Sequence, residues 1–356
     1  MRPARALIDL DALRHNYRLA RQLHGGKAFA VVKANAYGHG AITCARALAA
    51  EADGYAVAFL DEALALHAAG IKAPILLLEG VFDTAELVMA ARYGLWPVVH
   101  HAAQVEMIEK TPLPAPLRAW IKVNSGMNRA GFLPAAVRAV WKRLVVSGKV
   151  KDCGFMTHFA RADEPDVATT AEQIRVFDAA TRSLPGERSL ANSGAILAWP
   201  DAYRHWARPG IMLYGADPVP GGGHGLLPVM TLESQVVAVR DLAAGDPLGY
   251  GARFVAPRPM RVGLVAMGYA DGYPRAAPDH TPVVVGNQGA TLVGRVSMDM
   301  LTVDLTDLPE AGIGSVVELW GGQVSVNDIA QSVGTISYEL LCNVKRVDFV
   351  WLGDEA

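Results

Sequence analysis

The sequence of 356 residues has few cysteines and no long apolar segment. Its three cysteines, Cys44, Cys153 and Cys342, are odd in number and far apart, which excludes a disulfide framework and the close ligand spacing of a zinc site. No run of about 18 uncharged apolar residues occurs, so we expect no segment that crosses a membrane. The opening residues lack the apolar core of a secretory signal. These absences predict a cytoplasmic protein without a metal site.

Charge of one sign is not in excess either. The 33 Lys and Arg residues stand against 35 Asp and Glu residues, a formal net charge of −2, and the basic residues do not gather into a stripe. Neither a nucleic acid nor a membrane surface is therefore expected as a partner. Hydrophobic residues make up 51% of the chain, enough for a sizeable core. The length suits two domains, or one large barrel with an addition.

Short β-rich runs alternate with amphipathic stretches over the first two thirds of the chain. The runs are residues 27–33, 54–59, 74–79, 95–100, 117–123, 153–158, 188–192 and 206–215. The helical stretches are 11–23, 40–52, 61–70, 83–93, 101–110, 134–147 and 166–184, with Asp11, Asp61 and Asp83 as candidate N-caps. Eight β/α units predict an α/β fold with an N-terminal (β/α)8 TIM-type barrel. A doubly wound sheet is the alternative, because Pro209 weakens the eighth run.

The pattern changes after a Gly/Pro-rich break at residues 215–228. Beyond it, β-rich runs follow one another with turn residues between them, and one helical stretch stands out at 325–334. We therefore predict two domains, a barrel over residues 1–228 and a C-terminal mainly-β domain over residues 229–356.

Charged and polar side chains gather at the carboxyl ends of the predicted barrel strands, where TIM barrels carry their active sites. In chain order they are Lys33, Lys122, Arg129, His158, Ser193 and Arg208. Taken alone, Lys33 is better explained as a solvated rim charge and His158 as a core histidine. Because they end successive strands, together they favour a site.

A lysine opposite an anion pocket limits the kinds of ligand that the site can bind. The hydroxyl of Ser193 and the backbone at Gly194 and Gly210 suit a phosphate group. Pyridoxal 5'-phosphate (PLP), held as a Schiff base on Lys33, satisfies both features. A Schiff-base aldolase that acts on a sugar phosphate satisfies them equally, so the residues alone leave both open.

Eight motifs in order carry a resemblance to a known family. They are AVVKANAYGHG (30–40), KVNSGMNRAGF (122–132), THFARADE (157–164), RPGIMLYG (208–215), GYGARF (249–254), GYADGYPR (268–275), GRVSMDM (294–300) and TISYEL (335–340). Over its whole length the chain resembles bacterial alanine racemases, which are fold-type III PLP enzymes. The resemblance implies PLP-dependent interconversion of L-alanine and D-alanine (EC 5.1.1.1), either to supply D-alanine for peptidoglycan or in alanine catabolism.

The resemblance also implies roles for single residues. Lys33 would hold PLP and act on one face of the substrate, and Tyr250, from the partner of a head-to-tail homodimer, would act on the other. Lys122 would be carbamylated, and its carboxylate would hold Arg129. The expected cofactor contacts are Tyr37, Arg129, His158, Ser193, Arg208, Gly210, Ile211 and Tyr338. The expected substrate contacts are Arg129, Met298 and Asp299, with Tyr269 in the entry channel.

Elementary chemistry refines these implications. An arginine at the pyridine nitrogen can only donate a hydrogen bond, so Arg208 would leave that nitrogen unprotonated. A partly cationic neighbourhood of His158 and Arg208 would stabilise negative charge on Tyr250. Three tyrosines around the substrate, Tyr37, Tyr250 and Tyr338, would restrict it to alanine or serine.

The sequence departs from the family pattern at two positions, and three other functions compete with this interpretation. Asn124 stands where the family commonly has an acidic residue, and Ser297 stands where some members have cysteine. The rivals are a broad-specificity racemase, a decarboxylase of the same fold type, and a single-barrel PLP carrier. The GYGARF motif counts against the decarboxylase and the carrier, and the second domain counts against the carrier. His39 receives no role.

Overall fold

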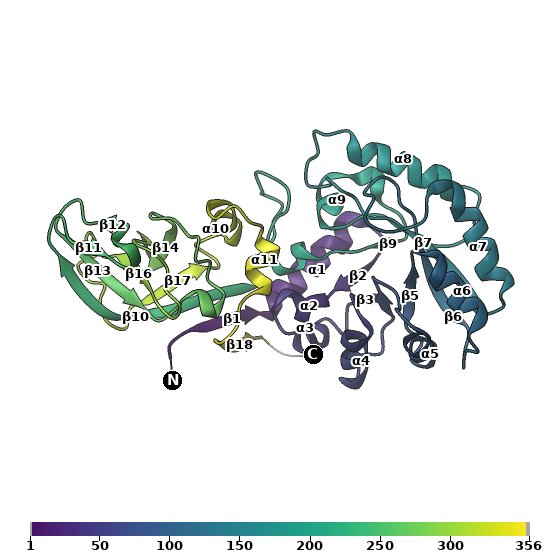
Figure 1. Ribbon diagram of the computed structural model, residues 1–356, viewed down its shortest axis with the longest axis horizontal. Helices are drawn as coiled ribbons and strands as arrows, with labels where there is room; N and C mark the ends of the chain where they lie inside the picture. The colour runs from purple at the N-terminus through teal and green to yellow at the C-terminus, as the bar shows by residue number, and fades with distance from the viewer. Residues whose placement is uncertain (1, 354–356) are drawn as a thin grey trace. The chain divides into compact units, whose positions relative to one another are not determined.

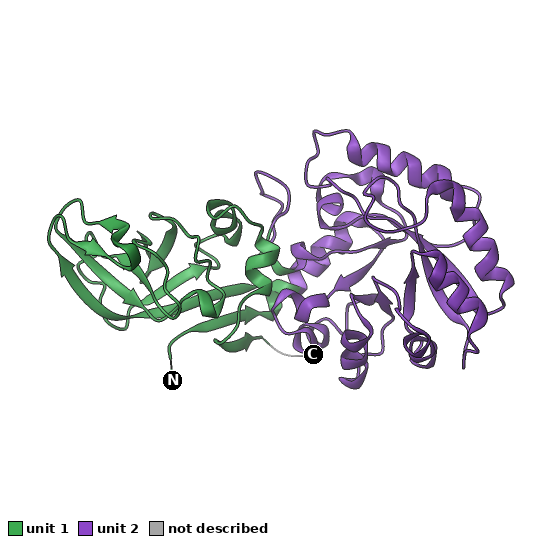
Figure 2. Ribbon diagram, viewed as in Figure 1, with its two compact units in different colours: residues 1–13, 214–216, 227–354 green, residues 14–213, 217–226, 355–356 purple. Residues whose placement is uncertain are grey.

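The computed structural model describes residues 2–353, which form two compact units (Figure 2). The barrel unit comprises residues 14–213 and 217–226, and the β unit comprises residues 2–13, 214–216 and 227–353. None of the helices in the described range is long and apolar enough to span a membrane.

A parallel eight-stranded sheet, in the order β8-β7-β6-β5-β4-β3-β2-β9, builds the barrel unit (Figure 1). Its strands are β2 (Lys27–Val31), β3 (Gly54–Val57), β4 (Ile75–Leu77), β5 (Trp96–Val99), β6 (Leu117–Lys122), β7 (Val150–Met156), β8 (Arg188–Ser189) and β9 (Trp206–Ala207). A parallel bridge between Asn192 and Arg208 joins the two ends of the sheet. The predicted TIM-type barrel is thus confirmed, and the doubly wound alternative is excluded. The eighth strand is shorter than predicted, and a 3₁₀ turn follows at Ile211–Tyr214.

All the predicted helices of the barrel region form. They are α1 (Leu10–His24), α3 (Ala41–Ala47), α4 (Leu60–Ala68), α5 (Thr84–Arg92), α6 (Ala102–Lys110), α7 (Val137–Val146) and α8 (Thr169–Thr181). A further short helix, α9 (Ser193–Ala198), was not expected. It begins where a strand-end loop was predicted, because the Asn192 side chain caps it by accepting from Ala195 N at 3.1 Å.

One of the three predicted N-caps is confirmed. Asp83 accepts from Glu86 N at 2.8 Å and begins α5. The assignment of Asp11 is wrong, because the carboxylate of Asp9 accepts from the N–H groups of Asp11 and Ala12, each at 2.9 Å. Asp61 is also wrong as a cap, since it lies inside the first turn of α4. In both cases the helix begins one or two residues earlier than its first acidic residue suggests.

Aromatic rings from four strands fill the barrel interior. Phe29 of β2 stacks on Trp206 of β9 at 4.0 Å between ring centroids, and Trp96 and Trp120 meet Phe29 edge-on at 5.9 Å. Strands β2 and β6 are not neighbours in the sheet, so these rings meet across the interior. Gly154 provides the space, because a β-carbon there would lie 2.6 Å from the Trp120 ring. The interior is therefore a packed core, and any ligand must bind at its mouth.

The β unit is a mainly antiparallel sheet in the order β15-β14-β17-β10-β1-β18, with β13 and β16 paired beside β10 (Figure 1). Its strands are β1 (Arg5–Asp9), β10 (Met230–Leu242), β13 (Met260–Val265), β14 (Pro282–Val285), β15 (Gln288–Thr291), β16 (Leu301–Asp304), β17 (Val316–Trp320) and β18 (Asp348–Leu352). Strands β11 (Pro247–Leu248) and β12 (Phe254–Val255) form a separate two-stranded sheet. Helix α10 (Val326–Ser332) matches the predicted stretch at 325–334, and α11 (Ser337–Cys342) was not expected.

The amino-terminal strand departs from the predicted domain division. Strand β1 pairs antiparallel with β10 and parallel with β18, so residues 2–13 belong to the β unit rather than to a barrel domain over residues 1–228. The apolar alternation of β1 matches the interior of either unit, and only its long-range pairing decides between them.

Candidate active site

Lys33 follows strand β2 and begins a left-handed turn, labelled α2 (Lys33–Tyr37) in Figure 1. Four consecutive non-glycine residues, Ala34 to Tyr37, have φ between 50° and 55°. Each costs roughly 1–2 kcal/mol for an L-residue, so such a run persists only where surrounding contacts hold it. Lys33 was predicted as the last residue of its strand. It lies two residues beyond β2, and the turn directs it to the barrel mouth.

The end of this turn meets the phosphate-side residues predicted from the sequence. Tyr37 is buried, and its hydroxyl lies so close to Gly210 that a β-carbon on residue 210 would be 2.7 Å from it. The hydroxyl of buried Ser193 accepts hydrogen bonds from Gly210 N at 2.9 Å and Met212 N at 3.3 Å. Ile211 lies between these two amides and is buried as well. The structure thus brings Tyr37, Ser193, Gly210 and Ile211 together.

Arg208 is the best anchored side chain of the site. Its Nη1 donates to Ser189 O at 2.8 Å and Ser189 Oγ at 2.6 Å. Its Nη2 donates to Leu190 O at 3.2 Å and to Thr157 O. Complete burial lowers the pKa of the guanidinium to about 10, which still leaves it charged at neutral pH. Its Nε makes no hydrogen bond within the described residues, so that N–H is available to a ligand.

Lys122 and His158 lie at the neighbouring strand ends, on β6 and just after β7. They line one small recess together with Arg129 and Thr157. Lys122 is 6% exposed, and its pKa lies below the usual lysine value because burial, with Arg129, Arg208 and Lys33 nearby, disfavours its charge. The predicted set of Lys122, Arg129 and His158 is therefore one cluster.

In the predicted cationic neighbourhood of Arg208 and His158, the histidine itself is uncharged. Burial lowers its pKa well below the ordinary value, and the charges of Arg208, Arg129, Lys122 and Lys33 lower it further. His158 is therefore a neutral imidazole at neutral pH, and the positive charge at this point belongs to Arg208.

Asn124, which departs from the family pattern, has a structural role. Its Oδ1 accepts from Gly126 N at 3.2 Å and Asn128 N at 3.0 Å, and its Nδ2 donates to Asn128 Oδ1. These bonds shape the loop that carries Arg129. An amide can both accept and donate here, which a carboxylate cannot.

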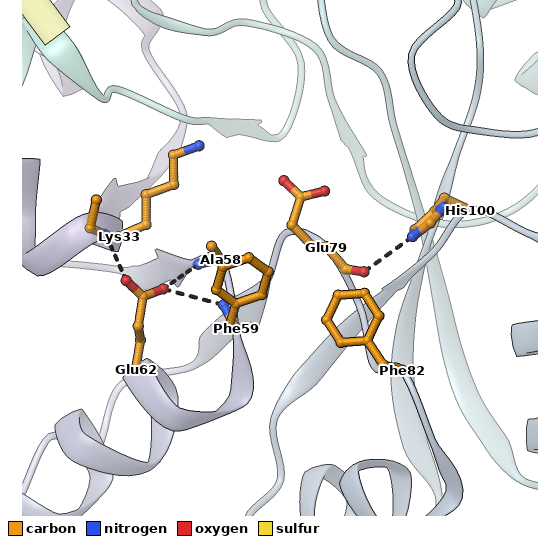
Figure 3. A pocket seen from close by; sticks show the side chains of 8 residues that line it. Lys33, Ala58, Phe59, Glu62, Glu79, Phe82 and His100 are labelled. Atoms are coloured by element: carbon orange, nitrogen blue, oxygen red, sulfur yellow. Dashed lines mark hydrogen bonds between the residues drawn. The ribbon is translucent and has the colours of Figure 1, made fainter. Parts of the chain in front are cut away.

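A cavity of about 520 Å³ opens beside Lys33 (Figure 3). Its walls come from the loops after β2, β3, β4 and β5 and from the first turn of α4, and they are formed by Lys33, Ala34, Ala58, Phe59, Glu62, Glu79, Phe82 and His100. Sequence reasoning missed Glu79 and His100. The same rule that found Lys33 would have found both, since they end the predicted strands 74–79 and 95–100.

The remaining predicted residues belong to the β unit. Tyr250 begins a 3₁₀ turn, Tyr250–Ala252, and its side chain is 69% exposed. Tyr269 N donates to Ser297 O at 3.0 Å, and Ala270 N donates to Met298 O at 3.0 Å, so the entry-channel and substrate segments are adjacent. Asp299 accepts from Arg346 Nη2 at 2.8 Å. Tyr338 lies in α11 and is half-buried.

Comparison with known families covers both units. Residues 8–218 match the family model for the alanine racemase N-terminal domain, and residues 229–351 match that for the alanine racemase C-terminal domain. The chain belongs to the alanine racemase family. Both domain models match in order, so a single-barrel PLP carrier and a sugar-phosphate aldolase are excluded.

Individual alanine racemases match over nearly the whole chain. The alanine racemase of Azoarcus sp. (strain BH72) is 73% identical over 353 residues, which cover 99% of this chain and 100% of that protein. The catabolic alanine racemase of Pseudomonas putida is 58% identical, again with 99% and 100% covered.

Solved alanine racemases share the fold. The biosynthetic enzyme from Pseudomonas aeruginosa superposes with a TM-score of 0.96 at 48% identity, covering 99% of this chain and 100% of that one. The alanine racemase from Bartonella henselae, which was solved with covalently bound pyridoxal phosphate, gives 0.91 at 32% identity, covering 99% and 100%.

Proposed function

We propose that this alanine racemase binds PLP on Lys33 and moves the α-proton of alanine between Lys33 and Tyr250 of the partner subunit. The observation that carries the proposal is the juxtaposition of two features at one barrel mouth. Lys33 opens onto a cavity, and the turn that it begins ends at Tyr37, against Ser193 and Gly210. The Bartonella henselae relative, which holds pyridoxal phosphate covalently, supports the same cofactor here.

The residues present fit PLP. The missing β-carbon at Gly210 lets the Tyr37 hydroxyl pack against the backbone near Ser193, so these groups would flank a bound phosphate. The Nε of Arg208, whose guanidinium is held by four hydrogen bonds, would donate to the ring nitrogen. Tyr338 of α11 completes the proposed phosphate set. When bound, PLP supplies a carbonyl that links to an amine and a ring that draws electrons from the substrate Cα.

The chain's own residues then handle the proton. Lys33 takes the proton from Cα, or returns it, on one face, and Tyr250 of the partner subunit does so on the other. Arg208 donates a hydrogen bond and gives up no proton, because its guanidinium stays charged. Arg129 and the Met298 backbone orient the substrate carboxylate, with Asp299 beside them and Tyr269 at the entry.

Lys122 is proposed to be a carbamate. Burial and neighbouring cations lower its pKa, which increases the share of neutral amine, and Glu79 opposes this shift. The neutral amine adds to the carbon of CO2: an N–C bond forms, one C=O π bond opens to place its electron pair on oxygen as a carboxylate, and the nitrogen releases one proton. The resulting carboxylate would attract Arg129, whereas an ammonium would repel it. We expect electron density on Nζ and a fall in activity without bicarbonate, with no bicarbonate response in Lys122→Met. Bare Nζ density would refute the carbamate.

The exposed position of Tyr250 supports a head-to-tail homodimer, since a catalytic tyrosine needs a site to enter. The cytoplasmic location stays a prediction. So does the restriction of the pocket to alanine or serine by Tyr37, Tyr250 and Tyr338. The relatives are named catabolic in one case and biosynthetic in another, and the same equilibrium chemistry serves D-alanine supply or alanine breakdown.

The central experiment is a panel of L-amino acids scored for the D-enantiomer. We expect the wild type to convert alanine, serine slowly and larger residues hardly at all. Lys33→Ala should lose both the absorbance of lysine-bound PLP and turnover, whereas the exposed control Lys72→Ala should keep both. Tyr250→Phe should retain PLP and lose about 100-fold or more in rate. Absence of D-alanine from the wild-type reaction would end the proposal.

A further inference from the structure

The left-handed turn from Ala34 to Tyr37 carries a proposed active-site side chain at each end. Lys33 precedes it and Tyr37 completes it, so a change in the turn displaces both. Its four residues with positive φ are not glycines, and contacts from outside the turn must therefore hold it.

His39 contacts the end of this turn. Its ring is fully buried, and Nδ1 lies 2.9 Å from Ala36 O and 3.0 Å from Tyr37 O. Carbonyl oxygens only accept, so Nδ1 must carry the hydrogen. Burial lowers the pKa of this imidazole to about 4, which keeps it neutral at working pH.

Glu62 contacts the start of the turn from helix α4 (Figure 3). Its Oε1 accepts from Ala34 N at 2.6 Å, and its Oε2 accepts from Ala58 N at 2.8 Å and Phe59 N at 3.2 Å. A carboxylate has acceptor capacity on both oxygens, which all three donors use. Glu62 therefore links the turn to the end of β3.

We propose that His39 and Glu62 are positioning residues that hold the left-handed turn at its two ends and thereby set Lys33 and Tyr37 for PLP. This inference rests on the proposed function. His39 acts through the carbonyls of Ala36 and Tyr37, and Glu62 acts through the N–H of Ala34. Neither residue takes part in the proton transfer.

Two substitutions at residue 39 separate positioning from packing. In His39→Asn the side-chain amide nitrogen falls near the place of Nδ1, whereas in His39→Gln it falls near the place of Nε2. We expect His39→Asn to stay close to wild type and His39→Gln to lose up to about 100-fold in kcat/KM for alanine, because misplaced groups cost about this much. The rate at which added PLP forms its lysine-bound absorbance band should fall in parallel.

A matched pair tests Glu62. Glu86 has the equivalent place in α5, where its carboxylate accepts from Phe82 N at 2.8 Å, but it does not contact the turn. Glu62→Gln and Glu86→Gln should lower the melting temperature by similar amounts. Only Glu62→Gln should slow lysine-bound PLP formation.

The results that would overturn this inference differ from those that would overturn the proposed function. If the wild type forms no D-alanine, or if Lys33→Ala still binds PLP covalently, the proposed function fails. If the wild type is active but both residue-39 variants lose PLP binding and melting temperature equally, His39 merely fills space and the inference is overturned. Equal PLP kinetics in Glu62→Gln and Glu86→Gln would overturn the role of Glu62.

Discussion

The hydroxyl of Tyr37 lies against the backbone of Gly210, so close that a β-carbon on residue 210 would sit 2.7 Å from it. This contact joins the turn after the first barrel strand to the loop after the last. It fixes one wall of the proposed phosphate recess. Gly210 is not at positive φ, so its lack of a side chain matters for space alone.

Gly210→Ala should therefore weaken PLP binding by displacing Tyr37. Overpacking of this kind costs about 1–3 kcal/mol, equivalent to roughly 5- to 150-fold in affinity. Titration of the apoprotein with PLP measures the change. Gly289→Ala is the control, because no atom lies within 4 Å of its added β-carbon. Equal affinity in both variants would contradict the proposed recess.

Mixing two inactive variants should restore activity if the proposed active site uses two chains. Lys33→Ala and Tyr250→Phe each disable their own homodimers. In a hybrid dimer, one of the two sites combines an intact Lys33 with an intact Tyr250. Random exchange between equal amounts makes half the dimers hybrid, so about a quarter of wild-type activity should return. No recovery after proven subunit exchange would assign Tyr250 to the same chain as Lys33.

Acid should destabilise the barrel unit through its buried histidines. The pKa of His24 is lowered to about 4 by burial and by Arg208, and that of His39 to about 4 by burial. Between pH 4 and about 6.5 the unfolded chain therefore binds more protons than the folded one, so stability falls as pH falls through this window. Urea unfolding at several pH values measures the slope, which His24→Phe should reduce. A slope unchanged in this variant would show that His24 titrates normally.

Arg208→Glu should change the products rather than only the rate. A carboxylic acid can share a proton with the ring nitrogen, which an arginine cannot, and a protonated ring favours transamination over return of the proton to Cα. The ratio of pyridoxamine phosphate formed to alanine racemised should rise. The variant also loses the four hydrogen bonds of Arg208 and is therefore less stable. The product ratio is still informative, because it does not depend on the amount of folded protein. An unchanged ratio would rule out this role for Arg208.

The sequence predicts the barrel well because its signals are local. Each predicted strand from 27–33 to 206–215 overlaps a strand of the structure, and the strand-end rule found Lys33, Lys122 and Arg208. The strand pairing of residues 5–9 depends on partners more than 220 residues away, so no local signal reports it. The neutral state of His158 could not be predicted from the sequence for the same reason, since its pKa depends on burial and on four cations from other segments.

The left-handed turn could not be predicted from the sequence either. Ala34, Asn35, Ala36 and Tyr37 have no glycine among them, and ordinary propensity favours a right-handed turn there. His39 received no role from the sequence because its partners are two backbone carbonyls, which every segment offers. Which carbonyls a buried imidazole contacts depends on the folded structure.

The place of β1 between β10 and β18 has a consequence for synthesis on the ribosome. Residues 5–9 leave the ribosome early, yet one of their two partners ends at residue 352. At about 5–20 residues per second, translation delays that pairing by roughly 20–70 s, while the barrel segments emerge in between. The nascent chain therefore carries an unpaired strand edge, open to association with other chains, for most of its synthesis.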